Sequence, residues 1–299
     1  MRFLVIILML LGALACGDDR PPSKKVLLIG LDGVRVDILD EAYTPHIDSL
    51  IANGFFGEAR VREPTVSGPG WSSMLTGVWP DKHRVYSNEF MGNAYDVYPD
   101  FLTRFEQLDS TVHTFAVIDW LPLATSTSGG PLLSVLVDSI VVMDGYDIGW
   151  SAADSASTAA ASDYLATSDV DAAFVYLGAI DEIGHETSSL APEYRAAIEK
   201  ADEHVGQLLD AIARRPTYGS EDWLVLSSSD HGRRDDGGHG ESSERELTIF
   251  FLASGPSVHL GEPSSPPGVV DVAVTALTYL DVAIAPTWGL DGRVAGLRR

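Results

Sequence analysis

Three apolar runs in this chain of 299 residues are each followed by an aspartate, and this repeated pattern constrains the fold most. Ligands of open parallel sheets gather at the carboxyl ends of the strands, so the three carboxylates are expected to meet at one edge of a sheet. A single aspartate after a strand usually caps a turn or a helix. Three such pairs are harder to explain in that way: Val26 to Ile29 with Asp32, Phe174 to Leu177 with Asp181, and Trp223 to Leu226 with Asp230.

Apolar runs rich in β-branched residues alternate with helical patterns along the chain, which predicts an α/β fold with a mostly parallel sheet. A hydrophobic content of 45% is ample for the core of one large domain, which we place at residues 26–299. Residues from about 90 to 165 are less regular, and we expect them to form a cap. The expected strands are 26–29, 112–118, 172–180, 223–226 and 248–253; the expected helices are one opening at Thr44-Pro45, then 71–75, 192–214, 271–280 and a cap helix over 151–166.

The amino terminus has the pattern of a secretory signal over residues 1–15, with a charged start, a short apolar run and small residues at its end. Cys16 is the only cysteine, and Leu14-Ala15-Cys16 resembles a bacterial lipobox. We therefore expect lipidation at Cys16, a tether over 16–25, and a periplasmic or membrane-anchored lipoprotein of a bacterium. Ordinary signal cleavage after Ala15, with Cys16 incidental, is the alternative.

The formal net charge of −23 argues against binding to a nucleic acid polymer, because phosphates would be repelled. The expected partner is instead a small substrate. An anionic substrate would need local positive charge, which bound metal ions can supply.

Histidines accompany two of the aspartates. His185 lies four residues after Asp181, His231 follows Asp230 directly, and His239 lies in a glycine-rich stretch. Mixed carboxylate and imidazole sets suit Zn²⁺, with Mn²⁺ or Fe as alternatives. One site with Asp, His and His and a second with Asp, Asp and His would make a centre for two divalent ions.

Ser67 is the candidate nucleophile, because it precedes the expected helix over Trp71 to Leu75. The amino end of a helix favours negative charge, and a metal ion bound to the same oxygen would lower its pKa further. A simple helix cap is the competing interpretation of Ser67, and the neighbouring metal-ligand pattern favours the nucleophile.

These motifs together resemble the alkaline phosphatase superfamily, most closely its type I phosphodiesterase/nucleotide pyrophosphatase branch. The matching segments keep the family's order: Gly30-Leu31-Asp32-Gly33, Thr44-Pro45-His46-Ile47-Asp48, Ser67 to Gly77, Pro80-Asp81-Lys82-His83, Asp181 to His185, Asp230-His231-Gly232, His239, Gly255-Pro256 and Gly289-Leu290-Asp291-Gly292. The resemblance implies a three-layer sandwich with a mostly parallel central sheet and a cap insert.

The resemblance also assigns roles to individual positions. It implies that Asp181, His185 and His239 hold one zinc ion, and that Asp32, Asp230 and His231 hold the other, which also contacts Ser67. Asn88 stands where the branch keeps an asparagine that donates to a phosphoryl oxygen. The implied reaction is in-line attack by Ser67 on phosphorus, followed by hydrolysis of a phosphoserine intermediate. We add Trp71 and Arg233 as candidate substrate-binding residues.

The sequence departs from the branch around its nucleophile. The branch usually has threonine where this chain has Ser67, and it often has an aromatic residue where this chain has Gly68. Ser67 to Trp71 also resembles the sulfatase nucleophile motif, but Trp71 stands where that motif needs arginine.

Basic residues are missing from a long part of the chain, with no Lys or Arg between Arg104 and Arg195. Monoesterases of the superfamily usually place a cation against the extra charge of a monoester, so this gap favours diesters, although Arg233 and Arg234 remain as substitutes. We expect a two-metal phosphodiesterase. The alternatives are a phosphomonoesterase or phosphonate hydrolase, with a sulfatase less favoured, and a non-catalytic surface lipoprotein.

Overall fold

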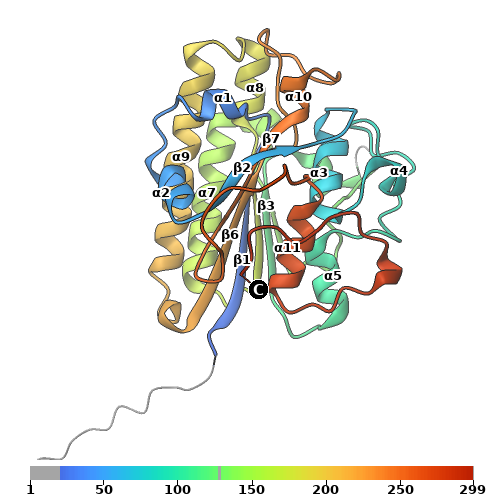
Figure 1. The fold of residues 1–299 in the computed structure, drawn as a ribbon, viewed down its shortest axis with the longest axis vertical. Helices are drawn as coiled ribbons and strands as arrows, with labels where there is room; N and C mark the ends of the chain where they lie inside the picture. Colours follow the sequence, from blue (N-terminus) through green and yellow to red (C-terminus); the bar gives the residue numbers. More distant parts are fainter. Residues whose placement is uncertain (1–20, 127–128, 299) are drawn as a thin grey trace, which may run out of the picture.

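A seven-stranded sheet lies between two layers of helices in the computed structural model, which describes residues 21–126 and 129–298 (Figure 1). The strand order is β2-β7-β6-β1-β5-β3-β4. The five strands from β6 to β4 are parallel, and β7 runs antiparallel to both β6 and β2. The strands are β1 (Ser23–Leu31), β2 (Gly54–Arg60), β3 (Thr114–Ile118), β4 (Ser139–Val142), β5 (Ala172–Leu177), β6 (Glu221–Ser228) and β7 (Thr248–Ser254).

Helices cover both faces of the sheet, so the expected three-layer α/β sandwich is confirmed (Figure 1). One layer holds α1 (Val36–Leu39), α2 (Pro45–Ala52), α7 (Trp150–Thr167), α8 (Ala179–Glu186) and α9 (Pro192–Ala213). The other holds α3 (Ser67–Thr76), α4 (Pro80–His83), α5 (Phe101–Leu108) and α11 (Asp271–Tyr279). Short elements complete the chain: α6 (Gly145–Ile148), α10 (Glu244–Leu247) and the 3₁₀ turns η1 (Leu121–Leu123), η3 (Tyr218–Ser220) and η4 (Pro286–Trp288).

The buried strand β1 shows why this sequence makes two cores. Successive side chains of a strand point to opposite faces of the sheet. Val26 and Leu28 pack with the α3 and α11 layer, whereas Leu27 and Ile29 pack with the α9 layer. A strand that is apolar at every position is therefore buried on both sides, as expected for a parallel sheet with helices on each face.

Two expectations about boundaries need correction. The strand expected over 172–180 ends at Leu177, and Asp181 lies in the first turn of α8 instead of directly after the strand. The apolar residues Ala179 and Ile180 extend the run, but they are the first residues of the helix and not the last of the strand. At the amino terminus β1 begins at Ser23, inside the expected tether over 16–25.

The segment from about 90 to 165, over which we expect a cap, also contributes elements to the sandwich itself. It supplies β3 and β4 at one edge of the sheet and α7 to the layer that contains α9. The strand β4 was not anticipated because it is only four residues long and partly exposed.

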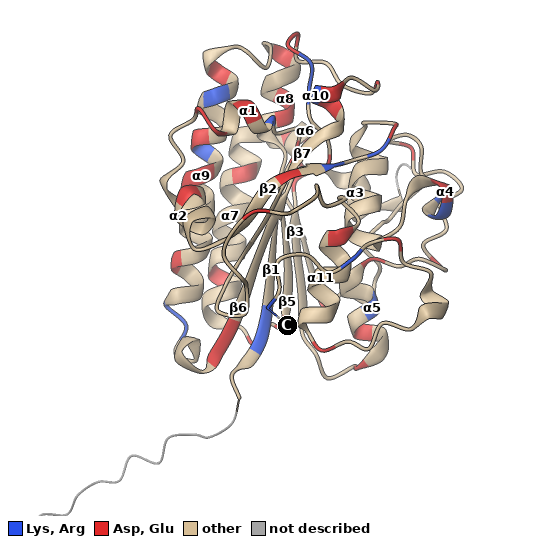
Figure 2. Ribbon diagram, in the orientation of Figure 1, with Lys and Arg blue, Asp and Glu red and all other residues tan. Residues whose placement is uncertain are grey.

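Charged residues lie mainly on the outer helices and on the loops (Figure 2). The central strands β1 and β6 carry their charges at the amino-terminal ends, with Lys24 and Lys25 on β1 and Glu221 and Asp222 on β6. The carboxyl ends of the same strands lead instead to buried aspartates. That opposite edge is where the candidate site lies.

Candidate metal centre and nucleophile

The three aspartates converge at the carboxyl edge of the sheet. β1 pairs with β6 so that Gly30 stands beside Ser228, and the two strands end at the same level. Asp32 and Asp230 follow those ends, and Asp181 joins them from the first turn of α8. All three side chains are buried, with 7% or less of their surface exposed. The strand-end pattern of the sequence therefore corresponds to one compact cluster of carboxylates.

The imidazole of His231 lies at the middle of this cluster. Its Nε2 atom is 3.4 Å from Asp230 Oδ2, 3.5 Å from Asp32 Oδ1 and 3.8 Å from Asp181 Oδ1. These atoms come from three strand-to-helix connections, and His231 itself is fully buried. The arrangement is that expected when several ligands face one shared ion.

A second group lies beside the first and shares Asp181 with it. His185 Nε2 is 3.2 Å from Asp181 Oδ2 and 2.9 Å from His239 Nε2. Candidate ligand atoms lie within 4.8 Å of one another in two sets, one of Asp181, His185 and His239 and the other of Asp32, Asp181 and His231. The first set is the trio expected from the sequence. In the second, Asp181 takes the place expected for Asp230, although Asp230 also contacts His231.

The chemistry of the donor atoms fits divalent metal ions. Asp32 Oδ1 and Asp230 Oδ2 are buried and have no hydrogen-bond partner within residues 21–126 and 129–298, whereas buried polar atoms are normally paired. Burial and the charge of Asp181 raise the pKa of Asp32 to about 7, and burial with the charges of Asp32 and Asp181 raises that of Asp230 well above its usual range. Carboxylates that repel one another in a dry site would be neutralised by cations.

Hydrogen bonds outside the cluster orient its ligands. His239 Nδ1 lies 2.7 Å from the carbonyl oxygen of Thr65, and His231 Nδ1 lies 3.0 Å from that of Gly232. A protonated Nδ1 that donates to a carbonyl leaves Nε2 as the lone-pair nitrogen facing the carboxylates. Burial lowers the pKa of both histidines, which keeps them in the neutral form that binds metal.

Trp71 supports a ligand and does not line a substrate pocket, contrary to our expectation. Its side chain is fully buried, and its indole Nε1–H donates to Asp32 Oδ2 at 3.1 Å. The hydroxyl of Tyr176 donates to the same oxygen at 2.5 Å, a contact that the sequence analysis missed. Two donors on Oδ2 leave Oδ1 as the free atom of Asp32 that faces His231.

Arg233 is also buried, so it cannot contact a substrate as we expected from the sequence. Its Nη1 atom donates to Asp181 Oδ1 at 2.7 Å and to the carbonyl oxygen of Asp181 at 2.7 Å. Burial alone would raise the pKa of Asp181, but the hydrogen bond with His185 and the charge of Arg233 hold it well below its usual range.

Ser67 is the first residue of α3, and its Oγ atom lies 3.4 Å from His231 Nε2. No side chain caps this helix, because the cap position is Val66. The backbone of α3 lies very close to the loop that carries Asp230. A Cβ at Gly70 would lie 2.6 Å from the carbonyl oxygen of Asp230. Glycine at this position therefore allows the close approach of Ser67 to the cluster.

Asn88 reaches the same helix end from the loop after α4. Its Oδ1 atom accepts a hydrogen bond of 2.7 Å from the backbone N–H of Gly68, and its side chain is exposed. Accepting through Oδ1 orients the amide, so that Nδ2 is its remaining donor. A Cβ at Gly68 would lie 2.5 Å from the carbonyl oxygen of Ser87, which explains why no aromatic residue follows the candidate nucleophile here.

Tyr146 is an exposed aromatic residue near the site that the sequence analysis did not single out. Its ring meets Trp150 edge-on at 4.9 Å between centroids, and 68% of its surface is exposed. Burial of part of the side chain and the charges of Glu182 and Asp181 raise the pKa of its hydroxyl. A tyrosine in a helix as short as α6 gives no local sequence signal of this position.

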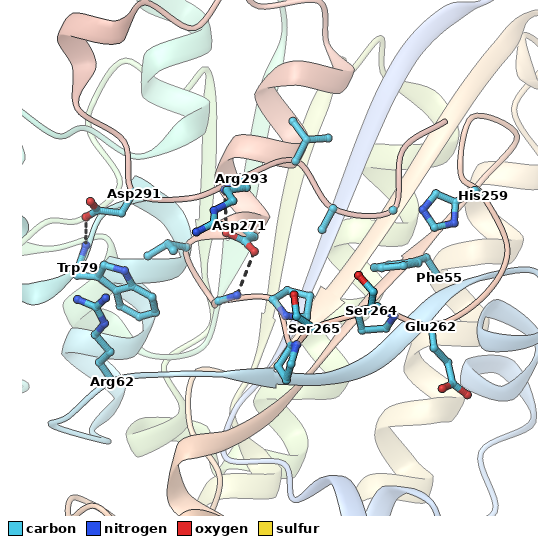
Figure 3. Close-up of a pocket in the computed structure, with 18 of the residues that line it drawn as sticks. Phe55, Arg62, Trp79, His259, Glu262, Ser264, Ser265, Asp271, Asp291 and Arg293 are labelled. Atoms are coloured by element: carbon cyan, nitrogen blue, oxygen red, sulfur yellow. Dashed lines mark hydrogen bonds between the residues drawn. The ribbon is translucent and has the colours of Figure 1, made fainter. Parts of the chain in front are cut away.

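A hollow with a volume of about 850 Å³ lies elsewhere on the molecule (Figure 3). We call it the C-terminal hollow; residues from 259 to 271 and from 291 to 296 line it with Phe55, Arg62, Trp79 and Asp81. None of the candidate ligands expected from the sequence is among these lining residues. Size alone therefore does not identify the site.

Comparison with known proteins identifies the family of this chain. A model of the type I phosphodiesterase/nucleotide pyrophosphatase family matches residues 26–235, which include all of the candidate ligands except His239. The chain belongs to this family. The resemblance stated from the sequence motifs is thereby confirmed, and family members act on phosphoesters.

Two curated relatives illustrate the range of similar proteins. GPI ethanolamine phosphate transferase 1 of Candida glabrata is 26% identical over 261 residues, covering 79% of this chain and 28% of that protein. Human ectonucleotide pyrophosphatase/phosphodiesterase family member 7 is 24% identical over 238 residues, covering 74% of this chain and 50% of that protein. The chain therefore spans half or less of the length of these relatives.

Solved structures share the fold. Murine ectonucleotide pyrophosphatase/phosphodiesterase 5, in complex with AMP, superposes with a TM-score of 0.68 at 14% identity, covering 91% of this chain and 98% of that chain. A phosphonate monoester hydrolase from Silicibacter pomeroyi gives a TM-score of 0.64 at 15% identity, covering 91% of this chain and 76% of that chain. Both support the alkaline phosphatase-like architecture.

The expected location needs correction. The curated relatives include eukaryotic GPI ethanolamine phosphate transferases from yeasts and from mouse, which contradicts a bacterial periplasmic or lipid-anchored location. The expected signal over 1–15 and the lipidation at Cys16 lie outside the described residues. Among the residues that the structure describes, no helix combines the length and apolar character needed to cross a membrane.

Proposed function

We propose that this protein is a two-metal phosphodiesterase that attacks phosphorus through Ser67. One observation carries the proposal: Ser67 Oγ lies 3.4 Å from His231 Nε2, beside buried carboxylate oxygens that have no hydrogen-bond partner. A hydroxyl at a helix amino end next to unpaired ligand atoms is suited to become a metal-activated nucleophile. Membership of the phosphodiesterase family supports the same reaction class.

Asp181, His185 and His239 would hold one divalent ion, and Asp32, Asp230 and His231 the other. Zn²⁺ is the ion that this mixture of carboxylates and imidazoles favours. When bound, the ions would supply Lewis-acid charge that lowers the pKa of the Ser67 hydroxyl and neutralises the leaving oxygen. The residues around them fix which atoms face inward, as Trp71 and Tyr176 do for Asp32.

The chain's own residues account for the remaining chemistry. Ser67 Oγ forms a bond to phosphorus as the bond to the leaving oxygen breaks, and the Ser67 proton passes to solvent. Water then attacks phosphorus in the phosphoserine, the Oγ–P bond breaks, and Ser67 regains a proton. Asn88 would donate through Nδ2 to a non-bridging oxygen, because Oδ1 already accepts from Gly68.

The charges near the nucleophile favour a diester over a monoester. A monoester carries an additional negative charge that a free cation would have to meet. Arg233 is fully buried on Asp181, and Arg234 lies 3.0 Å from Glu246, 3.4 Å from Asp236 and 3.8 Å from Glu241. Both arginines weighed from the sequence as substitutes are therefore already paired with carboxylates.

A second candidate function is transfer or hydrolysis of a diester that carries an ammonium group. The ring of Tyr146 is 68% exposed, and the charge of Glu182 is among the causes that raise the pKa of its hydroxyl. An exposed aromatic face under the influence of negative charge is suited to bind alkylammonium groups. The relatives named ethanolamine phosphate transferases make this substrate class worth testing.

The proposal is tested with zinc-loaded protein and bis-p-nitrophenyl phosphate. Ser67→Ala should lower kcat/KM by at least about 1,000-fold, and EDTA should remove the activity. Ser110→Ala, an exposed serine at the opposite edge of the sheet, is the matched control. Undiminished activity of the Ser67→Ala variant would exclude this nucleophile.

Recognition of an ammonium group is tested by comparing two chromogenic diesters. p-Nitrophenyl phosphorylcholine should be preferred over bis-p-nitrophenyl phosphate if the second candidate holds, and Tyr146→Ala should reduce that preference. Glu182→Gln removes the charge and should act in the same direction. Equal effects of both variants on the two substrates would reject ammonium recognition.

A further inference from the structure

Arg233 places a permanent positive charge inside the candidate metal centre. It is fully buried, and the guanidinium remains protonated in proteins. Nη1 donates to Asp181 Oδ1 and to the Asp181 carbonyl oxygen, each at 2.7 Å, and Nε donates to the carbonyl oxygen of Gly237 at 3.0 Å. Nη2 is buried and has no partner among the described residues.

The surrounding backbone leaves a slot for this side chain. A Cβ at Gly184 would lie 2.7 Å from Arg233 Nε and 2.8 Å from Cζ, and a Cβ at Gly33 would lie 3.2 Å from Nη1. Gly184 lies on α8 between Asp181 and His185, and Gly33 follows Asp32 directly. Side chains at these positions would displace the guanidinium, so the sequence makes room for it next to the ligands.

The oxygen that Arg233 contacts belongs to the residue that both ligand sets share, and it faces one histidine of each set. Asp181 Oδ1 is 3.8 Å from His231 Nε2 and 3.7 Å from His239 Nε2. Arg233 therefore neutralises the central carboxylate whether or not an ion is present. The same charge opposes any divalent ion that approaches Asp181, because like charges repel strongly in a site of low dielectric.

We propose that Arg233 is a built-in counter-cation that stabilises the metal-free centre and limits its affinity for divalent ions. This inference rests on the proposed two-metal function. It predicts two effects of opposite sign when the charge is removed: the metal-free protein becomes less stable, and zinc binds more tightly. A residue that only held Asp181 in position would weaken zinc binding when replaced.

The test measures the melting temperature of EDTA-treated protein and the zinc dissociation constant by competition with a chromophoric chelator. Arg233→Gln keeps a hydrogen-bond donor for Asp181 and removes the charge. It should lower the metal-free melting temperature and tighten zinc binding about tenfold. Arg233→Lys keeps the charge and should leave the zinc dissociation constant within about threefold of wild type. Arg234→Gln, which removes the same charge from the half-buried neighbouring residue, is the control.

The outcomes separate this inference from the function on which it rests. Unchanged or weaker zinc binding by Arg233→Gln, with a zinc-binding wild type, overturns the counter-cation and leaves the proposed function intact. A wild type that binds no zinc overturns the proposed function itself. If Arg233→Gln does not fold, Arg233→Lys decides: a large loss of zinc affinity despite the retained charge contradicts the inference.

Discussion

The metal centre and the C-terminal hollow are both rich in charged residues, yet they use their carboxylates differently. In the hollow, Asp271 accepts backbone hydrogen bonds from Gly268 at 3.0 Å and Arg293 at 2.8 Å, and Asp291 accepts one from Trp79 at 3.0 Å (Figure 3). In the centre, Asp32 Oδ1 and Asp230 Oδ2 have no such partner. Paired carboxylates hold loops together, whereas unpaired buried ones indicate a site for a cation.

The largest expected effect is at the shared ligand of the centre. Asp181→Asn should lower kcat/KM by at least about 1,000-fold, because it removes a charged ligand from both sets. The matching change in the hollow is Asp271→Asn, which should alter thermal stability and leave kcat/KM within about twofold. Steady-state kinetics of the two variants measure this difference in kcat/KM. Similar losses of kcat/KM in both variants would show that the carboxylates of the two regions do not differ in their importance for activity.

A smaller effect is expected for the residues that orient the ligands. Trp71→Phe keeps the aromatic packing but removes the donor to Asp32 Oδ2, so metal affinity or activity should fall about 10- to 100-fold. Tyr176→Phe removes the other donor and should act on the same oxygen. The zinc dissociation constants of the two variants measure the loss of affinity. Unchanged constants in both variants would show that these two hydrogen bonds are not needed to orient Asp32 for metal binding.

The stability of the folded protein should depend on pH through His83, which lies on the helix that contacts both regions. This buried residue of α4 lies 3.0 Å from Ser73 on the nucleophile helix, and its neighbour Lys82 pairs with Asp291 of the hollow. Burial lowers the pKa of His83 from 6.5 to about 4, so the folded state favours the neutral form. Its stability contribution is complete above about pH 6.5 and is lost as the pH falls toward 4, by up to about 3 kcal/mol.

Urea unfolding at several pH values checks this expectation. His83→Gln should be less stable near neutral pH and show a flatter loss of stability between pH 6.5 and 4. An unchanged slope in that variant would assign the acid sensitivity to other groups, of which the buried His204, with its pKa also lowered to about 4, is one.

The smallest effect is expected at the cations of the hollow. Arg62 stacks over Trp79 at 4.3 Å, and its guanidinium has no assigned part in the reaction. Arg62→Ala should leave kcat/KM on a small diester within about twofold. A loss above tenfold would mean that the hollow takes part in substrate binding and would break the division between the two regions.

The sequence was sufficient to place Asp32, Asp230 and His231 together, because a run of apolar residues followed by an acidic one is a local pattern. It missed the helical setting of Asp181, because the apolar run continues into the first residues of α8. The role of Tyr176 depends on pairing between β1 and β5, which places it beside Gly30, where Trp71 packs. No local pattern distinguishes a buried arginine such as Arg233 from an exposed one.

The contact between Thr65 and the segment after β6 has a consequence for local unfolding. The hydroxyl of Thr65 accepts from the amide of Gly240 at 3.0 Å and donates to the carbonyl oxygen of Glu241, while its own carbonyl meets His239. Opening either segment therefore exposes Ser67 and His239 in a single event. Hydrogen exchange at the Gly240 amide would report that event, and a ligand held by both segments should slow it.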